Sequence, residues 1–88
     1  EVERMYNTLK KESFDETRLS LAKTMVSNNR MAAHQIKRLA ESFSFDSNKL
    51  SFLKYAYTYC IDQQNYYECV DVLSFSSDKE NLLRYINN

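Results

Sequence analysis

The chain has 88 residues, 43% of them hydrophobic, and its 12 basic residues balance its 12 acidic ones. A chain of this length is one domain, because two separate cores would each be too small to be stable without metals or disulfides. The charge balance argues against duplex nucleic acid or an anionic membrane face as a partner, and no apolar run approaches the roughly 18 residues that a membrane-spanning helix needs.

The sequence contains neither glycine nor proline. Without glycine, the tight turns of β-hairpins lose the residue that most readily adopts positive φ. Without proline, nothing interrupts a helix internally. Both absences favour an all-α chain whose turns are built from Asn, Asp and Ser.

Apolar residues recur at helical spacing along the whole chain, which predicts six helices. Their ranges, in chain order, are about 2–12, 16–28, 33–42, 47–61, 66–74 and 78–87. The fourth has apolar side chains on nearly every face, so we expect it to be the central helix, packed on two sides.

One peptide occurs twice. SFDETRLSLAK at residues 13–23 returns as SFDSNKLSFLK at residues 44–54, with six of its eleven positions identical at an offset of 31. A fainter third copy starts with FSSD at residues 75–78, which aligns with FSFD at residues 43–46. The sequence therefore carries an internal repeat of 31–32 residues.

The repeated peptide is typical of a helix start. Asp15 and Asp46 are predicted as N-caps, whose carboxylates accept bonds from the free N–H groups of the first turn. Phe14 and Phe45 then form hydrophobic staples with leucines in the first turns, and we expect both rings to be anchored in the core. In the third copy, Ser77-x-x-Glu80 is predicted to be a capping box.

A pair of short helices cannot bury its apolar stripe alone, whereas stacked pairs close a common core. We therefore predict an all-α fold: a compact right-handed stack of about six short helices arranged as antiparallel helical hairpins. The chain is one helical-repeat domain, 1–88, with repeat units at about 13–43 and 44–75 and partial units at 1–12 and 76–88. The Gly and Pro positions of tetratricopeptide and ankyrin repeats are missing.

Cys60 and Cys69 are the only cysteines, and neither belongs to a CxxC pair. We expect both to be buried free thiols. A disulfide between them is the alternative, but axes of packed helices lie about 8–10 Å apart, which is wider than disulfide geometry favours.

No residue set suited to catalysis stands out. His34, the only histidine, is expected on the exposed first turn of the third helix, and one His with two separated Cys cannot complete a structural zinc site. Five carboxylates lie at predicted helix starts, where the helix dipole accounts for them: Asp15, Glu16, Asp46, Asp78 and Glu80. Solvation accounts for five basic side chains on helix faces: Lys10, Lys11, Arg30, Lys37 and Arg38. We expect no catalytic, cofactor-binding or metal-binding residues and no cofactor.

Five of the seven tyrosines lie within thirteen residues, from Tyr55 to Tyr67. Tyr57 and Tyr66 are assigned to the core. Tyr55, Tyr59 and Tyr67 are the candidate partner-binding residues, because tyrosine is enriched in protein contact surfaces. Packing in the core is the alternative for these three as well.

The chain also resembles a known family, the domain of unknown function numbered four-four-seven-six. SFDETRLSLAK, FSFDSNKLSFLKYAY, DQQNYYECVDVLSFSS and LLRYI carry the resemblance, which extends from about Leu9 to Ile86. It implies no catalytic residue, cofactor or ligand. Relatives tend to open the third helix with a Thr-x-x-Gln capping box; here Ala32 precedes Gln35, so we expect this helix start to be looser by about 1 kcal/mol.

Together these observations predict a non-catalytic helical module that binds a protein or peptide, with no nucleic acid and no membrane insertion. Because the chain begins at Glu1 and not at methionine, we expect it to be part of a larger protein. A structural spacer or capping domain with no specific ligand is the alternative. An enzyme is a third possibility, which would require a concave pocket with convergent polar groups.

Overall fold

Six helices and no strands make up the chain in the computed structural model, which describes residues 1–88. Their bounds are α1 Val2–Lys10, α2 Asp15–Asn28, α3 Ala33–Ala40, α4 Asp46–Tyr57, η1 Gln63–Val72 and α5 Ser76–Ile86. The prediction of an all-α chain with six helices is confirmed. The predicted ends lie within four residues of the observed ones. The largest difference is at the end of α4, which ends at Tyr57 and not near residue 61, and η1 begins three residues earlier than predicted.

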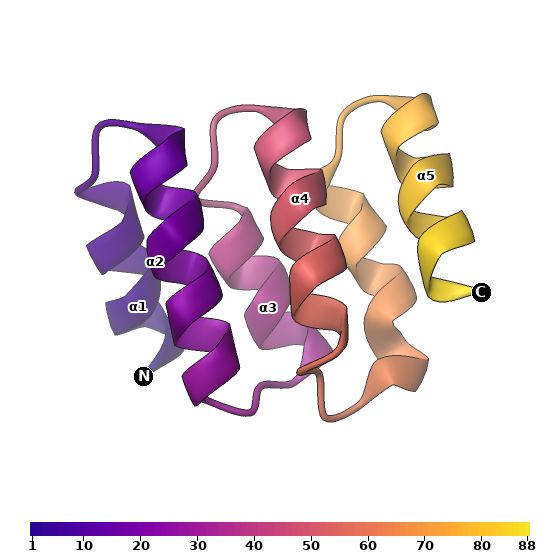
Figure 1. The fold of residues 1–88 in the computed structure, drawn as a ribbon, viewed down its shortest axis with the longest axis horizontal. Coiled ribbons are helices and arrows are strands. Elements are labelled where there is room, and N and C mark those ends of the chain that lie inside the picture. Colours follow the sequence, from indigo (N-terminus) through magenta and orange to yellow (C-terminus); the bar gives the residue numbers. More distant parts are fainter.

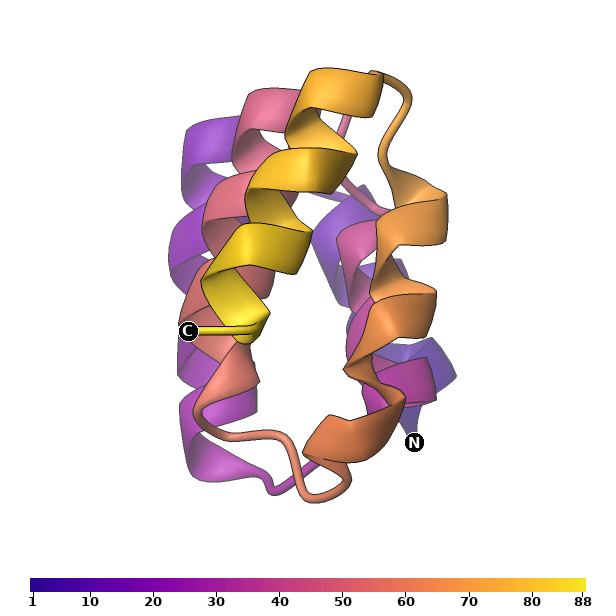
Figure 2. The same ribbon diagram turned by 90° about the vertical axis from the view of Figure 1, so that its right-hand side faces the viewer.

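The helices stand in two layers, with α2, α4 and α5 in one and α1, α3 and η1 in the other (Figures 1 and 2). Within the layers, α4 contacts both α2 and α5, and α3 contacts both α1 and η1. The loops joining α1 to α2, α3 to α4 and η1 to α5 lie along one edge, the upper edge in Figure 1. Each of these loops connects two helices that pack together, so α1–α2, α3–α4 and η1–α5 are three successive helical pairs.

One cluster of 17 buried hydrophobic residues fills the space between the layers. α3 buries Ala33, Ile36, Leu39 and Ala40 completely, at the apolar positions that helical spacing predicts. α4, predicted to be central, contacts helices on both sides of its own layer and α3 in the other layer. Cys60 and Cys69 are buried free thiols, as predicted.

The fifth helix differs from the prediction in start and type. It is a 3-10 helix that begins at Gln63 instead of an α-helix that begins near residue 66. In a 3-10 helix, side chains three residues apart eclipse one another and share one face. Tyr66 and Cys69, both completely buried, and Val72, packed against the core, have this spacing. A period of three therefore directs the apolar stripe of η1 into the core.

The predicted helix caps are wrong. Phe14, Phe45 and Phe75 are the N-cap residues of α2, α4 and α5, and no side chain caps any of these starts. Asp15 and Asp46 are instead the first residues of their helices. The Ser77-x-x-Glu80 box does not form either, since α5 already begins at Ser76.

The hydrophobic staples are wrong for the same reason. A staple residue precedes the N-cap, whereas Phe14 and Phe45 are the N-caps themselves. Both side chains project from the edge of the layer, and 72% and 66% of their surfaces are exposed. The third copy also shifts: Phe75 is equivalent to Phe45, so Ser76, and not Asp78, takes the position of Asp46.

Two side chains accept backbone N–H groups at the start of α3. Gln35 Oε1 accepts a hydrogen bond from the N–H of Ala32, at 2.9 Å. Asp62, in the loop after α4, adds a second acceptor: its Oδ1 lies 2.7 Å from the backbone nitrogen of Ala33. Side chains therefore bond the N–H groups of Ala32 and Ala33, and no N-cap side chain bonds the N–H groups that follow.

The buried hydroxyl of Tyr66 provides a test of the core. It donates a 2.6 Å hydrogen bond to the carbonyl oxygen of Leu53, and burial raises the pKa of this hydroxyl, so that it stays a donor. We expect Tyr66→Phe to lower the free energy of unfolding by about 1 kcal/mol in urea denaturation, because the bond is lost and the ring is kept. The control Tyr67→Phe changes an exposed ring and should have no effect. Equal losses in both variants would contradict this role for Tyr66.

Candidate interaction surface

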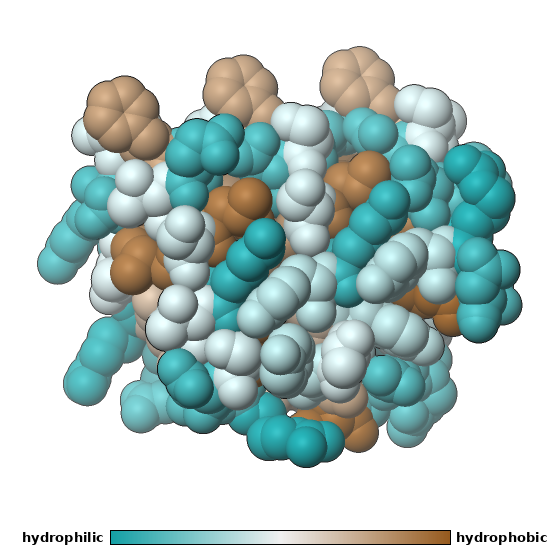
Figure 3. Space-filling model, viewed as in Figure 1, coloured by the Kyte–Doolittle hydropathy of each residue, from teal (hydrophilic) through white to brown (hydrophobic).

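Three phenylalanines are the most exposed large hydrophobic side chains of the molecule. Phe14, Phe45 and Phe75 have 72%, 66% and 64% of their surfaces exposed. They come from the three loops of the upper edge, and Figure 3 shows three hydrophobic side chains standing clear of the surface along that edge. We call these three residues the phenylalanine row. Because all three come from the loops of one edge, this edge is the candidate interaction surface.

The backbone at each position of the row has the same conformation. All three residues are extended, with φ and ψ of −115° and 132° for Phe14, −119° and 141° for Phe45, and −100° and 136° for Phe75. Each one stands directly before the first residue of a helix of the α2–α4–α5 layer. The repeated sequence therefore builds one local structure three times.

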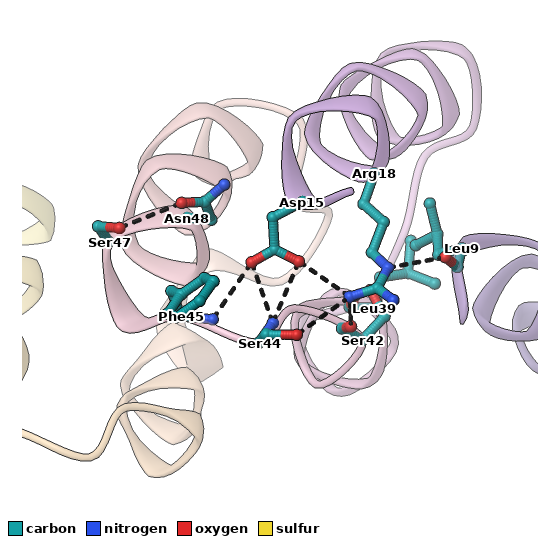
Figure 4. Close-up of polar contacts among 9 residues, drawn as sticks. All are labelled: Leu9, Asp15, Arg18, Leu39, Ser42, Ser44, Phe45, Ser47 and Asn48. Carbon is teal, nitrogen blue, oxygen red and sulfur yellow. Dashed lines mark hydrogen bonds and ion pairs between the residues drawn. The ribbon is translucent and has the colours of Figure 1, made fainter. Parts of the chain in front are cut away.

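The first helical pair holds the loop of the second pair through Asp15 (Figure 4). The Asp15 carboxylate accepts hydrogen bonds from the backbone N–H of Ser44, at 3.1 Å, and from that of Phe45, at 3.2 Å. It also forms an ion pair of 2.8 Å with Arg18, and the side chains of both residues are more than nine-tenths buried. Asp15 therefore connects two pairs.

Arg18 completes this contact from the buried side. Its guanidinium donates to the carbonyl oxygens of Leu9, near the end of α1, and of Ser42, in the loop between α3 and α4, both at 3.0 Å. It also donates to the hydroxyl of Ser44 at 3.3 Å. Because its hydrogen bonds reach both α1 and the loop between α3 and α4, the buried charge has the partners that a buried guanidinium needs.

The second pair holds the third in the same way. The Asp46 carboxylate accepts from the backbone N–H of Ser74, at 2.8 Å, and from that of Phe75, at 3.1 Å. Lys49 is equivalent to Arg18, and it donates to the carbonyl oxygen of Val72 at 3.0 Å. Val72 precedes Ser74 by two residues, as Ser42 precedes Ser44. We call each set, Asp15 with Arg18 and Asp46 with Lys49, an inter-pair clasp.

The clasps position the phenylalanine row. Phe45 and Phe75 each donate their backbone N–H to the carboxylate of the preceding pair, so their places are set by that pair. Burial tends to raise the pKa of the Asp46 carboxyl, but the N–H groups of Phe75 and Ser74, then the Asp78 side chain and the charge of Lys49, lower this pKa below its ordinary value. The carboxylate is thus the form that holds the loop.

The third pair cannot form the same clasp with a further pair. Ser76 stands where Asp15 and Asp46 stand in the other pairs, and Lys79 takes the position of Arg18 and Lys49. The cation is retained and the carboxylate is absent. The hydrogen-bonding pattern that joins the three pairs therefore ends at α5.

The predicted partner-binding tyrosines lie in two places. Tyr55 on α4, 37% exposed, packs against the half-buried Tyr59 with ring centroids 5.4 Å apart, and the Lys23 ammonium lies 5.2 Å from the Tyr55 ring. Tyr67 on η1, 62% exposed, lines a separate pocket of about 410 Å³ with Leu83 and Ile86 of α5. Tyr55 and Tyr59 are thus brought together, and Tyr67 is not part of that surface.

The other candidate residues are dispersed. His34 is exposed on the first turn of α3, as expected. Burial raises the pKa of the Cys60 thiol to about 11 and that of Cys69 to about 12, so both thiols are protonated near neutral pH. No group of three or more His, Cys, Asp or Glu side chains is arranged to hold a metal ion. None of the helices is both long and apolar enough to cross a lipid bilayer.

The exposure of the phenylalanine row was not predicted, because a Phe-Asp peptide at a helix start can have either the Phe or the Asp as its N-cap residue. One signal could have distinguished them: each phenylalanine lies between polar residues, in Ser-Phe-Asp twice and in Ser-Phe-Ser once. An apolar residue flanked by small polar residues in all three copies fits a loop tip better than a core position.

Comparison with known proteins gives one match. The family model described as a domain of unknown function (DUF4476) matches residues 1–86. No curated protein and no solved structure matches the chain.

Because the two clasps differ in burial, we expect their removal to lower the free energy of unfolding by different amounts. Asp15→Ala leaves the buried Arg18 without its carboxylate, so we expect a loss of about 3 kcal/mol in the free energy of unfolding. Asp46→Ala removes two charge-assisted bonds beside the less buried Lys49, and we expect a loss of about 1.5 kcal/mol. The control Asp71→Ala removes an exposed ion pair with Lys37 and should cost less than about 0.5 kcal/mol. Equal losses in all three variants would contradict the clasps.

The Asp46 clasp also has a pH dependence of known sign. Folding lowers the pKa of this carboxyl, so its stabilisation is present above the unfolded value of about 3.9 and is lost as the pH falls through the folded value. The stability difference between the native protein and Asp46→Ala should therefore shrink below about pH 4 in urea denaturation at a series of pH values. A difference that stays constant down to acid denaturation would contradict it.

Proposed function

The chain belongs to the family of the domain of unknown function DUF4476, and we propose that it is a non-catalytic helical module that binds a protein or peptide through the phenylalanine row. The exposure of three equivalent rings, one from each helical pair, carries the proposal. The partner-binding surface that we now favour is the row, with the Tyr55–Tyr59 surface and Tyr67 as the competing surfaces.

The energetics support binding. Transferring one phenylalanine ring from water to an apolar contact contributes roughly 2 kcal/mol to the free energy of binding. A partner can gain this contribution from each of the three exposed rings. Aromatic side chains also dominate the energy of many protein interfaces. A partner that covers the row would gain this contribution.

The rigidity of the row adds to this. Two of the three backbone positions are held by carboxylates, and all three adjoin helix starts. A surface ordered before binding loses little conformational entropy when the partner arrives. The clasps therefore support binding as well as folding.

A spacer or capping role is the second candidate. The absence of a carboxylate at Ser76 favours it, because the pattern that joins successive pairs stops there. A domain that only caps a stack of helices does not require exposed phenylalanines, and each exposed ring favours aggregation. The row therefore favours the interaction module.

The proposal is tested by replacing the three phenylalanines of the row with serine. In the triple variant Phe14→Ser, Phe45→Ser, Phe75→Ser, we expect a change of less than about 1 kcal/mol in the free energy of unfolding, because the rings contact solvent and not the core. Proteins cross-linked to the native domain in a lysate of its source cells should be absent from the same experiment with the triple variant. The comparison between variants, and not capture alone, is the measurement.

The control variant Tyr55→Ser, Tyr67→Ser removes two other exposed rings and should retain those cross-links. If the cross-links disappear in this variant and persist in the triple phenylalanine variant, the binding surface is the tyrosine surface and the row is not used. If both variants retain every cross-link, neither surface binds a partner and the spacer is favoured. Unfolding of the triple variant would show that the rings serve stability.

A further inference from the structure

We infer that the outer side of the first helical pair is a docking face for a helical pair of another polypeptide, one whose second helix begins with an aspartate. The outer side is the side of α1–α2 that faces away from the second pair, at the left end of the stack in Figure 1. The inference goes beyond the proposed function and does not rest on it, because it uses the backbone of Phe14 and not its ring. Two features of this side carry it: two backbone donors and an uncovered apolar position.

The backbone donors lie in the loop between α1 and α2. In each inter-pair clasp, an aspartate accepts the N–H groups of a serine and of the phenylalanine that follows it. The equivalent N–H groups of the first loop belong to Ser13 and Phe14, and no carbonyl oxygen or side chain of the chain accepts either of them. Phe14 has the same extended backbone as Phe45 and Phe75, so the donors have the same local geometry. The acceptor that fits this loop is therefore a carboxylate from a pair stacked on the outer side.

The apolar position shows which side of a pair its preceding neighbour covers. The seventh residue of α2, α4 and α5 is Leu21, Phe52 and Leu82. Phe52 and Leu82 are completely buried, whereas Leu21 is only half-buried. The third pair packs on a preceding pair and on no following one, so contact with the preceding pair accounts for the burial of Leu82. A pair docked on the outer side of α1–α2 would cover Leu21 in the same way.

The outer side of α1 has a mixed character. Met5 is half-buried, while Ile36 at the same position of α3 is completely buried, so α1 adds apolar surface to the face. Thr8 is exposed, while Leu39 at the same position of α3 is completely buried. Interfaces between proteins that associate reversibly are about as polar as the rest of the surface, and permanent interfaces are more apolar. The face therefore suits a separate polypeptide that binds reversibly.

A second copy of this chain is not the partner that fits best. Ser76 stands where the clasp aspartates stand, so the third pair of a second copy would offer a neutral hydroxyl to the N–H groups of Ser13 and Phe14. Hydrogen bonds to a carboxylate are shorter and stronger than bonds to a neutral oxygen. The partner is therefore a pair that carries the aspartate.

One substitution, Ser76→Asp, makes the chain a model of that partner. It places a carboxylate at the first residue of α5, the position of Asp46 in α4. The outer side of the third pair also has an uncovered apolar position, because Leu83 is half-buried while Leu53, at the same position of α4, is completely buried. The variant thus combines the acceptor with an apolar side that can pack on α1–α2.

The experiment titrates the isotope-labelled native domain with the unlabelled Ser76→Asp variant and follows the backbone amides by NMR. We expect the variant to bind about tenfold more tightly than the unlabelled native domain does, because a charged acceptor strengthens both hydrogen bonds. The amides of Ser13, Phe14 and Leu21 should shift. The amide of Phe45, which is already bonded to a carboxylate, should not.

Two control variants test the position of the charge and the face that receives it. Ser77→Asp adds the same charge one residue further along α5, away from the position of the clasp aspartates, and should bind no better than the native domain. Thr8→Arg in the labelled domain changes an exposed residue, so the domain should fold, and its large charged side chain should abolish the shifts.

The outcomes separate this inference from the proposed function. If Ser76→Asp and Ser77→Asp cause equal shifts, charge alone drives the association and the inference is wrong. If neither variant shifts the first loop, the outer side does not receive an aspartate-bearing pair, and the inference is wrong as well. Shifts confined to Phe14, Phe45 and Phe75 would overturn it in favour of contact through the phenylalanine row. The cross-linking comparison does not involve Ser76, so it decides the proposed function independently.

Discussion

The structure depends on one interaction, the hydrogen bonds between an aspartate at the start of one helix and two backbone N–H groups in the loop of the next helical pair. Each N–H pair precedes a helix start and would otherwise need water or a cap. A carboxylate accepts both N–H groups at once, and charge-assisted bonds of this kind are stronger than bonds between neutral groups. Because the same residues occur in the first two pairs, one short peptide joins three pairs into a stack.

The cations of the two clasps, Arg18 and Lys49, differ in burial and in the number of carbonyl oxygens that they bond. Arg18 is buried and bonds the carbonyl oxygens of Leu9 and Ser42, while Lys49 is less buried and bonds one carbonyl oxygen. The planar guanidinium presents several donors in fixed directions, so it suits the site where several acceptors converge. The opposite edge has its own connection: Ile61 donates to the carbonyl oxygen of Met31, and Asp62 accepts from Ala33. Hydrogen bonds therefore join successive pairs at both edges, with the apolar core between them.

The clasp and the exposed rings are two results of one geometry. When the aspartate is the first helical residue, the phenylalanine before it becomes the N-cap, has an extended backbone and leaves most of its side chain exposed. The core does not need these rings, since an apolar residue shortly before each of them is already buried: Leu9, Phe43 and Leu73. The repeat therefore places an aromatic ring from each helical pair along one edge, and the core remains packed without these rings.

The sequence by itself determined the helices, the repeat and the buried thiols. The periodicity of apolar residues and the lack of Gly and Pro are local properties, and α1 to α4 lie close to the ranges that they predict. The type of η1 escaped this reasoning, because spacings of three and of 3.6 residues agree over so short a segment. Only the tertiary structure decided where the carboxylates of Asp15 and Asp46 and the rings of Phe14 and Phe45 point. A Phe-Asp start can place either residue at the N-cap, and the choice depends on N–H groups 28–30 residues further along the chain, which reach the aspartate only when the pairs are stacked.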